Sequence, residues 1–261
     1  MKKEKIAMLA PSFIAEFDKD IVSKLRKLGF DKVVELTFGA KMINRDYHKI
    51  LEKSKELVIS SVCPGIVSFV KEKFPQFEKN LIKVDSPMAA MVKICRKNYP
   101  GCEITFISPC NFKKQEGKEI GIACLDYREL SKFFQKKRIT VGKNNEFDKF
   151  YNEYTRIYPL SGGLSKTAHL KGVLKKGEEK TIDGWKDVEA YLKKPNKEIR
   201  FLDCTFCKGG CVGGPYLSRF SLGERKKRVL AYLEQAKKES IKTGKRGLVE
   251  KALGISFRKE F

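Results

Sequence analysis

The stretch that decides the fold of this chain is Phe201-Leu-Asp-Cys-Thr-Phe-Cys-Lys-Gly-Gly-Cys-Val-Gly-Gly-Pro215. It holds Cys204, Cys207 and Cys211, three of the eight cysteines, with four glycines, and a short β-like run over residues 199–202 leads into it. Such a segment buries little apolar surface, whereas glycines let backbone amides approach a ligand and thiolates are soft metal ligands. The loop therefore predicts an iron–sulfur site. The alternative that the loop alone leaves open is a disulfide-tied or irregular loop.

The length and composition fit a soluble globular protein. At 261 residues the chain can bury a large core, as one domain or two small lobes. No apolar run approaches the ~18 residues that span a membrane. The first ten residues contain an apolar stretch of only five, which favours a first β-strand over a signal peptide. We therefore expect a cytoplasmic protein with no membrane association, whose cysteines are thiols or metal ligands rather than disulfides.

The formal charge of +23 is spread along the whole chain. Nucleic-acid binding is the first interpretation of such a charge, but no helix-turn-helix, zinc-finger or RNA-binding signature accompanies it. A basic surface also attracts an acidic protein partner and raises its rate of encounter. The remaining alternative is a general lysine bias without any partner. We expect no nucleic acid to be bound.

Short β-branched runs alternate with longer amphipathic ones, which predicts an α/β fold with mainly parallel strands. The expected strands cover residues 6–9, 32–36, 57–60, 103–107, 120–125 and 199–202. The expected helices cover residues 20–28, 40–55, 64–74, 87–98, 127–137, 185–193 and 221–242. Outside the helix at 185–193, the region 138–198 gives no clear assignment beyond a glycine turn at 161–163.

Three cysteine-bearing segments directly follow expected strands. Cys63 follows the strand at 57–60, Cys110 follows the strand at 103–107, and the glycine-rich loop follows the strand at 199–202. Open parallel sheets place their binding sites past these strand ends, so the three segments are expected to meet in one cleft. Cys63 also precedes a helix, whose dipole favours a thiolate. Cys95 and Cys124 fit buried core thiols, and Cys102 fits either role.

Three segments carry a resemblance to a known family: Ser61-Val-Cys-Pro-Gly65, Ser108-Pro-Cys-Asn-Phe-Lys-Lys114 and Cys207-Lys-Gly-Gly-Cys-Val-Gly-Gly-Pro215. Weaker matches occur in the same order at residues 10–12, 28–33, 86–87, 127–130 and 158–163. Together they resemble the catalytic H-cluster domain of the FeFe hydrogenases nearly end to end, without the ferredoxin-like domains that usually precede it. We expect a single H-cluster domain over residues 1–261, of uncertain lobe boundary.

The resemblance implies two lobes of mainly parallel sheet flanked by helices, with the cofactor in the cleft between them. It implies a 4Fe–4S cubane bound by four thiolates, of which one, Cys211, also bridges to a diiron subcluster with CO, cyanide and azadithiolate ligands. Lys113 and Ser12 would donate to the cyanides, and Cys211 and Lys113 are the implied catalytic residues. The implied cubane ligands are Cys63, Cys110, Cys207 and Cys211, and the implied cofactor-binding residues are Ser12, Pro11, Pro109, Lys113, Ser86 and Tyr158.

The chain also departs from the pattern of the family. Val62 stands where the usual catalytic members carry a second, proton-donating cysteine, and Val62 cannot titrate. The family's glutamate-rich relay segment corresponds to residues 41–48 of this chain. Only Asp46 or Tyr47, depending on a one-residue alignment choice, could take the place of its proton-carrying residue. Ser108 and Thr205 replace pocket methionines. The usual proton route is therefore absent, and the candidates for another are Cys204, Asp203, Glu116 and Asp46.

The resemblance implies an anaerobic iron hydrogenase that interconverts H2 with protons and electrons. An acidic ferredoxin or similar carrier is the expected electron partner because of the basic surface, and hydrogenase maturation proteins are expected to supply the cofactor. Two alternatives remain. One is a regulatory H2 sensor with low turnover, which the loss of the second cysteine favours. The other is an assembly-type relative that holds only the 4Fe–4S cluster, which the presence of Ser12, Lys113 and Cys211 disfavours.

Overall fold

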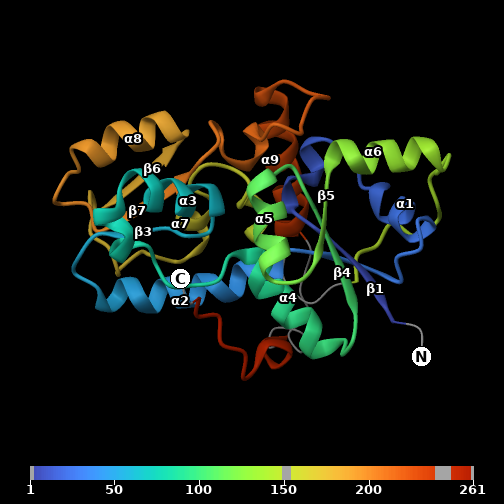
Figure 1. Ribbon diagram of the computed structural model, residues 1–261, viewed down its shortest axis with the longest axis horizontal. Coiled ribbons are helices and arrows are strands. Elements are labelled where there is room, and N and C mark those ends of the chain that lie inside the picture. Colours follow the sequence, from blue (N-terminus) through green and yellow to red (C-terminus); the bar gives the residue numbers. More distant parts are fainter. Residues whose placement is uncertain (1–2, 149–153, 239–247, 260–261) are drawn as a thin grey trace.

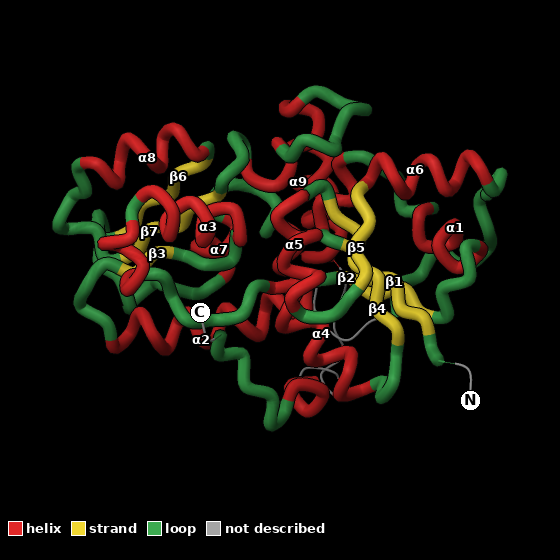
Figure 2. The backbone as a smooth tube through the Cα atoms, viewed as in Figure 1, coloured by secondary structure: helices red, strands yellow, loops and turns green. Residues whose placement is uncertain are grey.

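The computed structural model describes residues 3–148, 154–238 and 248–259 and builds them around two parallel sheets (Figure 1, Figure 2). The first sheet has the order β2-β1-β4-β5, and the second has the order β3-β7-β6. Every strand pair in both sheets is parallel. The strands are β1 (Lys5–Leu9), β2 (Lys32–Glu35), β3 (Val58–Ile59), β4 (Glu103–Ser108), β5 (Ala123–Asp126), β6 (Glu179–Asp183) and β7 (Phe201–Thr205).

The helices cover both sheets and fill the space between them (Figure 1). The α-helices are α1 (Ile21–Lys27), α2 (Thr37–Lys53), α3 (Pro64–Lys73), α4 (Pro87–Asn98), α5 (Asn111–Glu119), α6 (Tyr127–Lys136), α7 (Gly163–Thr167), α8 (Trp185–Lys193) and α9 (Leu222–Lys238). The 3-10 helices are η1 (Pro11–Ala15), η2 (Pro75–Asn80), η3 (Tyr154–Ile157), η4 (Gly210–Gly213) and η6 (Leu248–Ala252). We call the first sheet with α1, α4, α5 and α6 the first lobe, and the second sheet with α3, α7 and α8 the second lobe.

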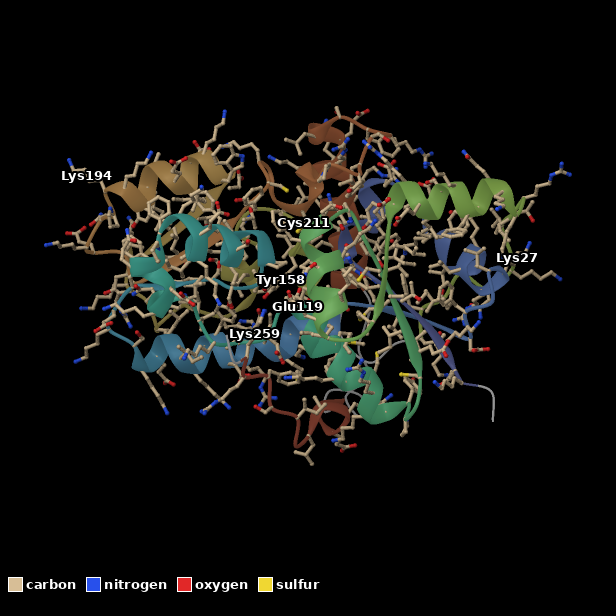
Figure 3. The ribbon with its side chains drawn as sticks, viewed as in Figure 1. Lys27, Glu119, Tyr158, Lys194, Cys211 and Lys259 are labelled. Atoms are coloured by element: carbon tan, nitrogen blue, oxygen red, sulfur yellow. The ribbon has the colours of Figure 1, made fainter. Side chains whose placement is uncertain are left out.

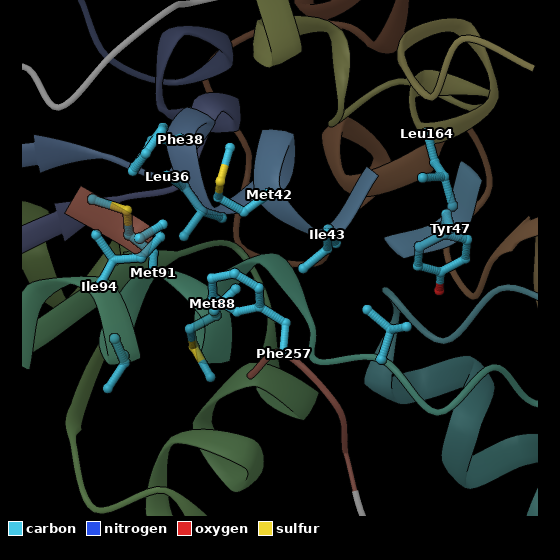
Figure 4. Packing of buried hydrophobic residues seen from close by; sticks show 14 of the residues in the cluster. Leu36, Phe38, Met42, Ile43, Tyr47, Met88, Met91, Ile94, Leu164 and Phe257 are labelled. Atoms are coloured by element: carbon cyan, nitrogen blue, oxygen red, sulfur yellow. The ribbon is translucent and has the colours of Figure 1, made fainter. Parts of the chain in front are cut away.

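The two lobes share one apolar core. Ile6 and Met8 of β1 belong to the same buried cluster as Val58 of β3 and Phe201 of β7. Helix α2 contributes to this cluster along its length (Figure 4). It runs beneath the second lobe and packs against α4 of the first lobe (Figure 1). Each lobe also has a cluster of its own. Because α2 packs against both lobes, the ends of the two sheets are held at a fixed distance from each other.

Helix starts follow local sequence signals. Helices α3 and α4 begin with proline, which has no N–H to leave unpaired at the first helical position. The Ser86 hydroxyl accepts a 3.2 Å hydrogen bond from the amide of Ala89 and caps α4. Asp126 and Glu129 form a reciprocal capping box at the start of α6. These caps fix the entry of each helix directly after a strand or loop that carries a candidate site residue.

The parallel α/β class and the two-lobed arrangement are confirmed, and most boundaries agree within a few residues. Among the strands and α-helices, three were not predicted. Helix α5 is mostly polar, β6 is an exposed edge strand, and α7 is a short helix that begins at the Gly162–Gly163 turn. The strand expected from residue 120 begins only at Ala123, because Gly121 turns the chain with φ +69°. Residues 239–242 of the last expected helix lie outside the described residues.

Within the ranges given above, none of the helices combines the length and the apolar character that a bilayer crossing requires.

Candidate metal centre

Four cysteines gather where strands of both sheets end. Cys63 and Cys110 are the N-cap residues of α3 and α5, which follow β3 and β4. Cys207 and Cys211 lie in the loop that follows β7, which is hydrogen-bonded to β3. Their thiols are electrostatically coupled, since Cys211 feels the charges of the other three and Cys207 feels those of Cys63 and Cys110. The structure therefore brings together the three segments that the sequence places at strand ends.

Burial controls the ionisation of these thiols. Burial, together with the nearby Cys63, raises the pKa of Cys110 to about 11. The first backbone amides of α5, at Phe112 and Lys113, act in the opposite direction by donating toward the Cys110 sulfur. Burial likewise raises the pKa of Cys207 to about 12. A bound metal would displace these protons, because thiolates are the ligands.

Cys211 combines an exposed side chain with a shifted thiol. Burial and the other three cysteines raise the pKa of this thiol strongly. In the view of Figure 3, Cys211 lies between the two lobes. The Lys113 ammonium lowers the pKa of this thiol, and the thiol in turn raises that of Tyr127. The Cys211 thiol therefore lies near a cation and near the buried Tyr127 side chain.

The chemistry of the donor set fits an iron–sulfur cluster. Thiolates are the usual ligands of such clusters, and a cubane takes one thiolate at each of four irons. The four electrostatically coupled cysteines supply that number of thiolates.

Lys113 is a half-buried cation in an ion pair. Its ammonium lies 2.6 Å from a carboxylate oxygen of Glu116, and the two side chains are 12% and 4% exposed. Burial opposes ionisation of Glu116, but the Lys113 charge outweighs it, so the pKa of Glu116 is lowered. Lys259 adds a second, longer contact of 3.9 Å to this carboxylate. Glu116 is therefore held ionised beside the site. An ammonium has three donors, which leaves Lys113 able to meet an anionic ligand as well.

The other residues implied by the resemblance lie in η1, directly after η3 and β4, and at the start of α4. Ser12 is buried in η1, directly after Pro11, and its hydroxyl is 2.7 Å from that of Tyr127. The Tyr158 hydroxyl donates a 2.7 Å hydrogen bond to Asn44 of α2. Ser86 caps α4, and Pro109 packs against Gly214 of the loop. Their contacts to a cofactor remain predictions.

Among the candidate proton carriers, Cys204 and Asp46 occupy different surroundings. Cys204 is fully buried in the core of the second lobe, with its sulfur 3.9 Å from the Ser60 hydroxyl. Burial raises its pKa strongly, and the nearby Asp203 adds to the rise. Asp46 is half-buried on α2, where burial raises its pKa against the charges of Lys49 and other basic residues. The Cys63 thiol also acts on Cys204 and raises its pKa. The roles of Cys204 and Asp46 in proton transfer stay predictions.

The glycines of the loop are required by the chain itself. A Cβ at Gly213 would lie 1.8 Å from the carbonyl oxygen of Lys208, and Gly210 has φ +80°. A Cβ at Gly210 would also lie 2.5 Å from the carbonyl oxygen of Pro159. The loop thus folds back tightly on itself and on the preceding turn, and this fixes Cys207 and Cys211 relative to each other.

A groove of about 800 Å³ reaches two of the candidate ligands from the surface. Cys110 and Cys207 line it together with Phe206, Trp185 and Lys208. Phe206 stacks on Trp185 with a centroid distance of 6.5 Å. The sequence analysis missed this groove, although Phe206 sits between two cysteines. The site is therefore close to solvent at Cys110 and Cys207.

The comparisons with known proteins agree with this geometry. The family model for the iron only hydrogenase large subunit, C-terminal domain, matches residues 3–215. A curated relative, Iron hydrogenase 1 of Clostridium pasteurianum, is 25% identical over 82% of this chain and 50% of its own length. The chain thus spans about half the length of that relative.

Solved structures establish the fold. An apo FeFe-hydrogenase HydA1 variant from Chlamydomonas reinhardtii superposes with a TM-score of 0.73 at 16% identity, covering 97% of this chain and 90% of that one. A second variant of HydA1 gives a TM-score of 0.71 at 17% identity, covering 95% and 88%. The family match over most of the sequence, on a fold of the same kind and with the cysteine segments joined in space, leads to one conclusion. The chain belongs to the family of the iron only hydrogenase large subunit, C-terminal domain.

Proposed function

We propose that this chain is a minimal FeFe hydrogenase that interconverts H2 with two protons and two electrons. The observation that carries the proposal is the meeting of Cys63, Cys110, Cys207 and Cys211 at one place, where their thiols are electrostatically coupled. These four thiolates would hold a 4Fe–4S cubane, and Cys211 would also hold a diiron subcluster with CO, cyanide and azadithiolate ligands. When bound, that cofactor would supply the chemistry that makes and breaks the H–H bond of H2.

The residues around Cys211 would bind and orient anionic ligands. Lys113 places a positive charge beside Cys211, and its ion pair with Glu116 fixes the direction of the ammonium group. The Ser12 hydroxyl is fixed by its 2.7 Å contact with Tyr127. Ser12 is buried and the Lys113 side chain is only 12% exposed, so little water competes with the ligands they would meet.

Electrons would enter through the groove beside Cys110 and Cys207. Its apolar wall includes Phe206 and Trp185, and the Trp185 side chain is exposed at the surface. Lys208 is ion-paired with Asp183 and Asp187, so the groove is not strongly cationic by itself. The attraction for a small acidic ferredoxin would instead come from the net charge of +23 carried by the whole chain. The groove would then provide the short-range apolar contact.

The decisive experiment is an infrared spectrum of protein loaded with cofactor by hydrogenase maturation proteins under anaerobic conditions. The proposal predicts CO and cyanide stretching bands, together with H2 evolution from a strong reductant. A protein that binds four irons but shows neither band is a cubane-only relative, and this result would overturn the proposal. Cys102→Ser is a matched control, since Cys102 is half-buried and lies outside the coupled set.

The second candidate function, a regulatory H2 sensor, is favoured by one observation. Val62 occupies the position directly before Cys63 and has no proton to give. A sensor would show the same infrared bands but would turn over H2 slowly at every pH with any reductant. Measured turnover therefore separates the two functions, while the infrared bands separate both from the cubane-only relative.

A further inference from the structure

Residues 248–259, which we call the η6 segment, are held against helix α4 by side-chain hydrogen bonds (Figure 1). Asn98, the last residue of α4, donates a 2.8 Å hydrogen bond to the carbonyl of Lys251. Lys93, in the middle of α4, donates a 3.0 Å hydrogen bond to the carbonyl of Ser256. The segment therefore follows α4 back toward the start of that helix, where Ser86 is the cap residue.

The last residues of the η6 segment are fixed through their backbone and through one buried ring. The Asp85 amide donates a 2.7 Å hydrogen bond to the carbonyl of Phe257, and the Lys259 amide donates a 3.3 Å hydrogen bond to the carbonyl of Lys83. The Phe257 side chain is buried in the core cluster that also contains Met88 of α4 (Figure 4). These contacts fix the backbone from which the Lys259 side chain extends.

Lys259 brings a second cation to Glu116. Its ammonium lies 3.9 Å from Oε1 of Glu116, whereas the Lys113 ammonium lies 2.6 Å from Oε2. Oε1 is buried, and within the described part of the chain no hydrogen bond reaches it. A buried carboxylate oxygen without a hydrogen bond is costly. The Lys259 side chain is 26% exposed, so its charge is only partly screened by solvent and offsets part of that cost.

The three side chains together carry one net positive charge. The pair of Lys113 and Glu116 alone would be neutral, and Lys259 adds the second cation. Burial raises the pKa of Glu116, but the two lysines and the Ser86 hydroxyl lower it by more. The charge of Glu116 also acts on Asp85, which is paired with Lys93, and on Cys124 of β5. Two cations therefore share the Glu116 carboxylate.

We propose that Lys259 is a positioning residue for the anionic ligands of the cofactor, acting through Glu116 on Lys113. Because Lys259 attracts the carboxylate from the Oε1 side, Glu116 neutralises Lys113 less completely, and Lys113 keeps positive charge for a ligand beside Cys211. The inference rests on the proposed hydrogenase function. It adds that residues 248–259, which contain no cysteine, complete the charge of the site.

The first test uses protein without cofactor. Lys259→Met removes the charge and keeps a long side chain, and Lys83→Met is the matched control, because Lys83 is exposed and its backbone pairs with that of Lys259. Carbon-13 NMR of the glutamate carboxyl groups follows Glu116, whose signal is the one lost in Glu116→Gln. The pKa of Glu116 should be higher in Lys259→Met and unchanged in Lys83→Met, since a cation favours the carboxylate. An equal pKa of Glu116 in wild type and Lys259→Met would overturn the inference.

The second test uses protein loaded with cofactor and reads the cyanide stretching bands. A cyanide band should move in Lys259→Met, return toward its wild-type position in Lys259→Arg and stay in place in Lys83→Met. A merely structural role of Lys259 would lower the melting temperature and leave the bands where they are. Unmoved bands in Lys259→Met would contradict the positioning role alone. Wild-type protein without these bands would contradict the hydrogenase function and the positioning role together.

A double-mutant cycle tests whether Lys259 acts through Glu116. The shifts of the cyanide band caused by Lys259→Met and Glu116→Gln should not add, because the second change removes the group that links Lys259 to Lys113. Additive shifts would contradict this link. The rate of H2 evolution should fall about two- to fivefold in Lys259→Met, which is the size expected for an ion pair that is partly exposed. A wild-type rate in Lys259→Met would also contradict the positioning role.

Discussion

At the scale of the residue, the buried carboxyl groups differ in whether a neighbouring cation compensates their charge. Lys113 and Glu116 compensate each other, and the Lys113 charge lowers the pKa of Glu116. Asp203 forms no salt bridge within the described residues, and burial raises its pKa to about 6. The two buried carboxyl groups are therefore expected to differ in the pH at which they ionise.

The stability of the protein should report the protonation of Asp203. Its pKa rises from the ordinary 3.8 to about 6 on folding. Between these values the native state keeps a proton that the unfolded chain has released, so stability falls as pH rises through this window and the loss is complete above it. The wild type should lose about 2–3 kcal/mol across the window relative to Asp203→Asn. Denaturant titrations of both proteins measure this difference, and parallel pH dependences would show that Asp203 ionises normally.

Cys211→Ser should separate the two parts of the proposed cofactor. Serine is a poor ligand for iron and cannot bridge to a second cluster through sulfur, so the CO and cyanide bands should vanish. The three remaining cysteines should still bind iron, in reduced amount, as measured by metal analysis. Retention of full-intensity CO and cyanide bands in Cys211→Ser would show that the diiron subcluster is attached elsewhere.

At the scale of the element, the starts of two helices and one loop hold the thiols. Cys63 and Cys110 are the N-cap residues of α3 and α5, and the first amides of α5 donate toward the Cys110 sulfur. Helix α8 begins at Trp185 beside the groove, where its aromatic side chain packs against Phe69 and Phe206. The groove wall is therefore continuous with the core of the second lobe and keeps its shape when a partner docks.

Trp185→Ala should weaken docking without affecting the metal centre. The Trp185 side chain is 39% exposed, and its loss removes apolar contact area at the groove beside Cys207. The KM for a ferredoxin should rise about three- to tenfold, while the rate with a small artificial reductant stays the same. Phe133→Ala is a matched control, because Phe133 is 43% exposed on α6 of the first lobe. Equal effects of the two variants would argue against the groove as the docking site.

The elements of the fold were predictable where burial leaves a periodic pattern. Strands β1, β4 and β7 are apolar and buried, and the cysteines after β3, β4 and β7 marked the edge of the sheets on which the site lies. Helix α5 and strand β6 are too polar to give such a pattern, so both were missed. The contacts that refine the site were also beyond the sequence. Ser12 and Tyr127 are 115 residues apart, and Ser165 and Asp203 are 38 apart, so only the folded chain brings them together.

At the scale of the whole molecule, the basic charge and the position of the site act together. The net charge of +23 would attract an acidic partner from a distance, and the groove lined by Cys110 and Cys207 would then receive it. Raising the salt concentration from about 20 mM to about 500 mM should lower the ferredoxin-driven rate several-fold, since screening shortens the attraction. The rate with a neutral reductant should not change. A ferredoxin-driven rate that ignores ionic strength would contradict electrostatic docking.

The central claim is that thiolates from three distant parts of the chain share one inorganic cluster. A crystal structure of the anaerobically reconstituted protein, with anomalous scattering measured at the iron edge, tests it most directly. We predict one compact iron site with the sulfurs of Cys63, Cys110, Cys207 and Cys211 around it. Iron bound at Cys204, Cys207 and Cys211 alone, or at separate positions, would contradict the account.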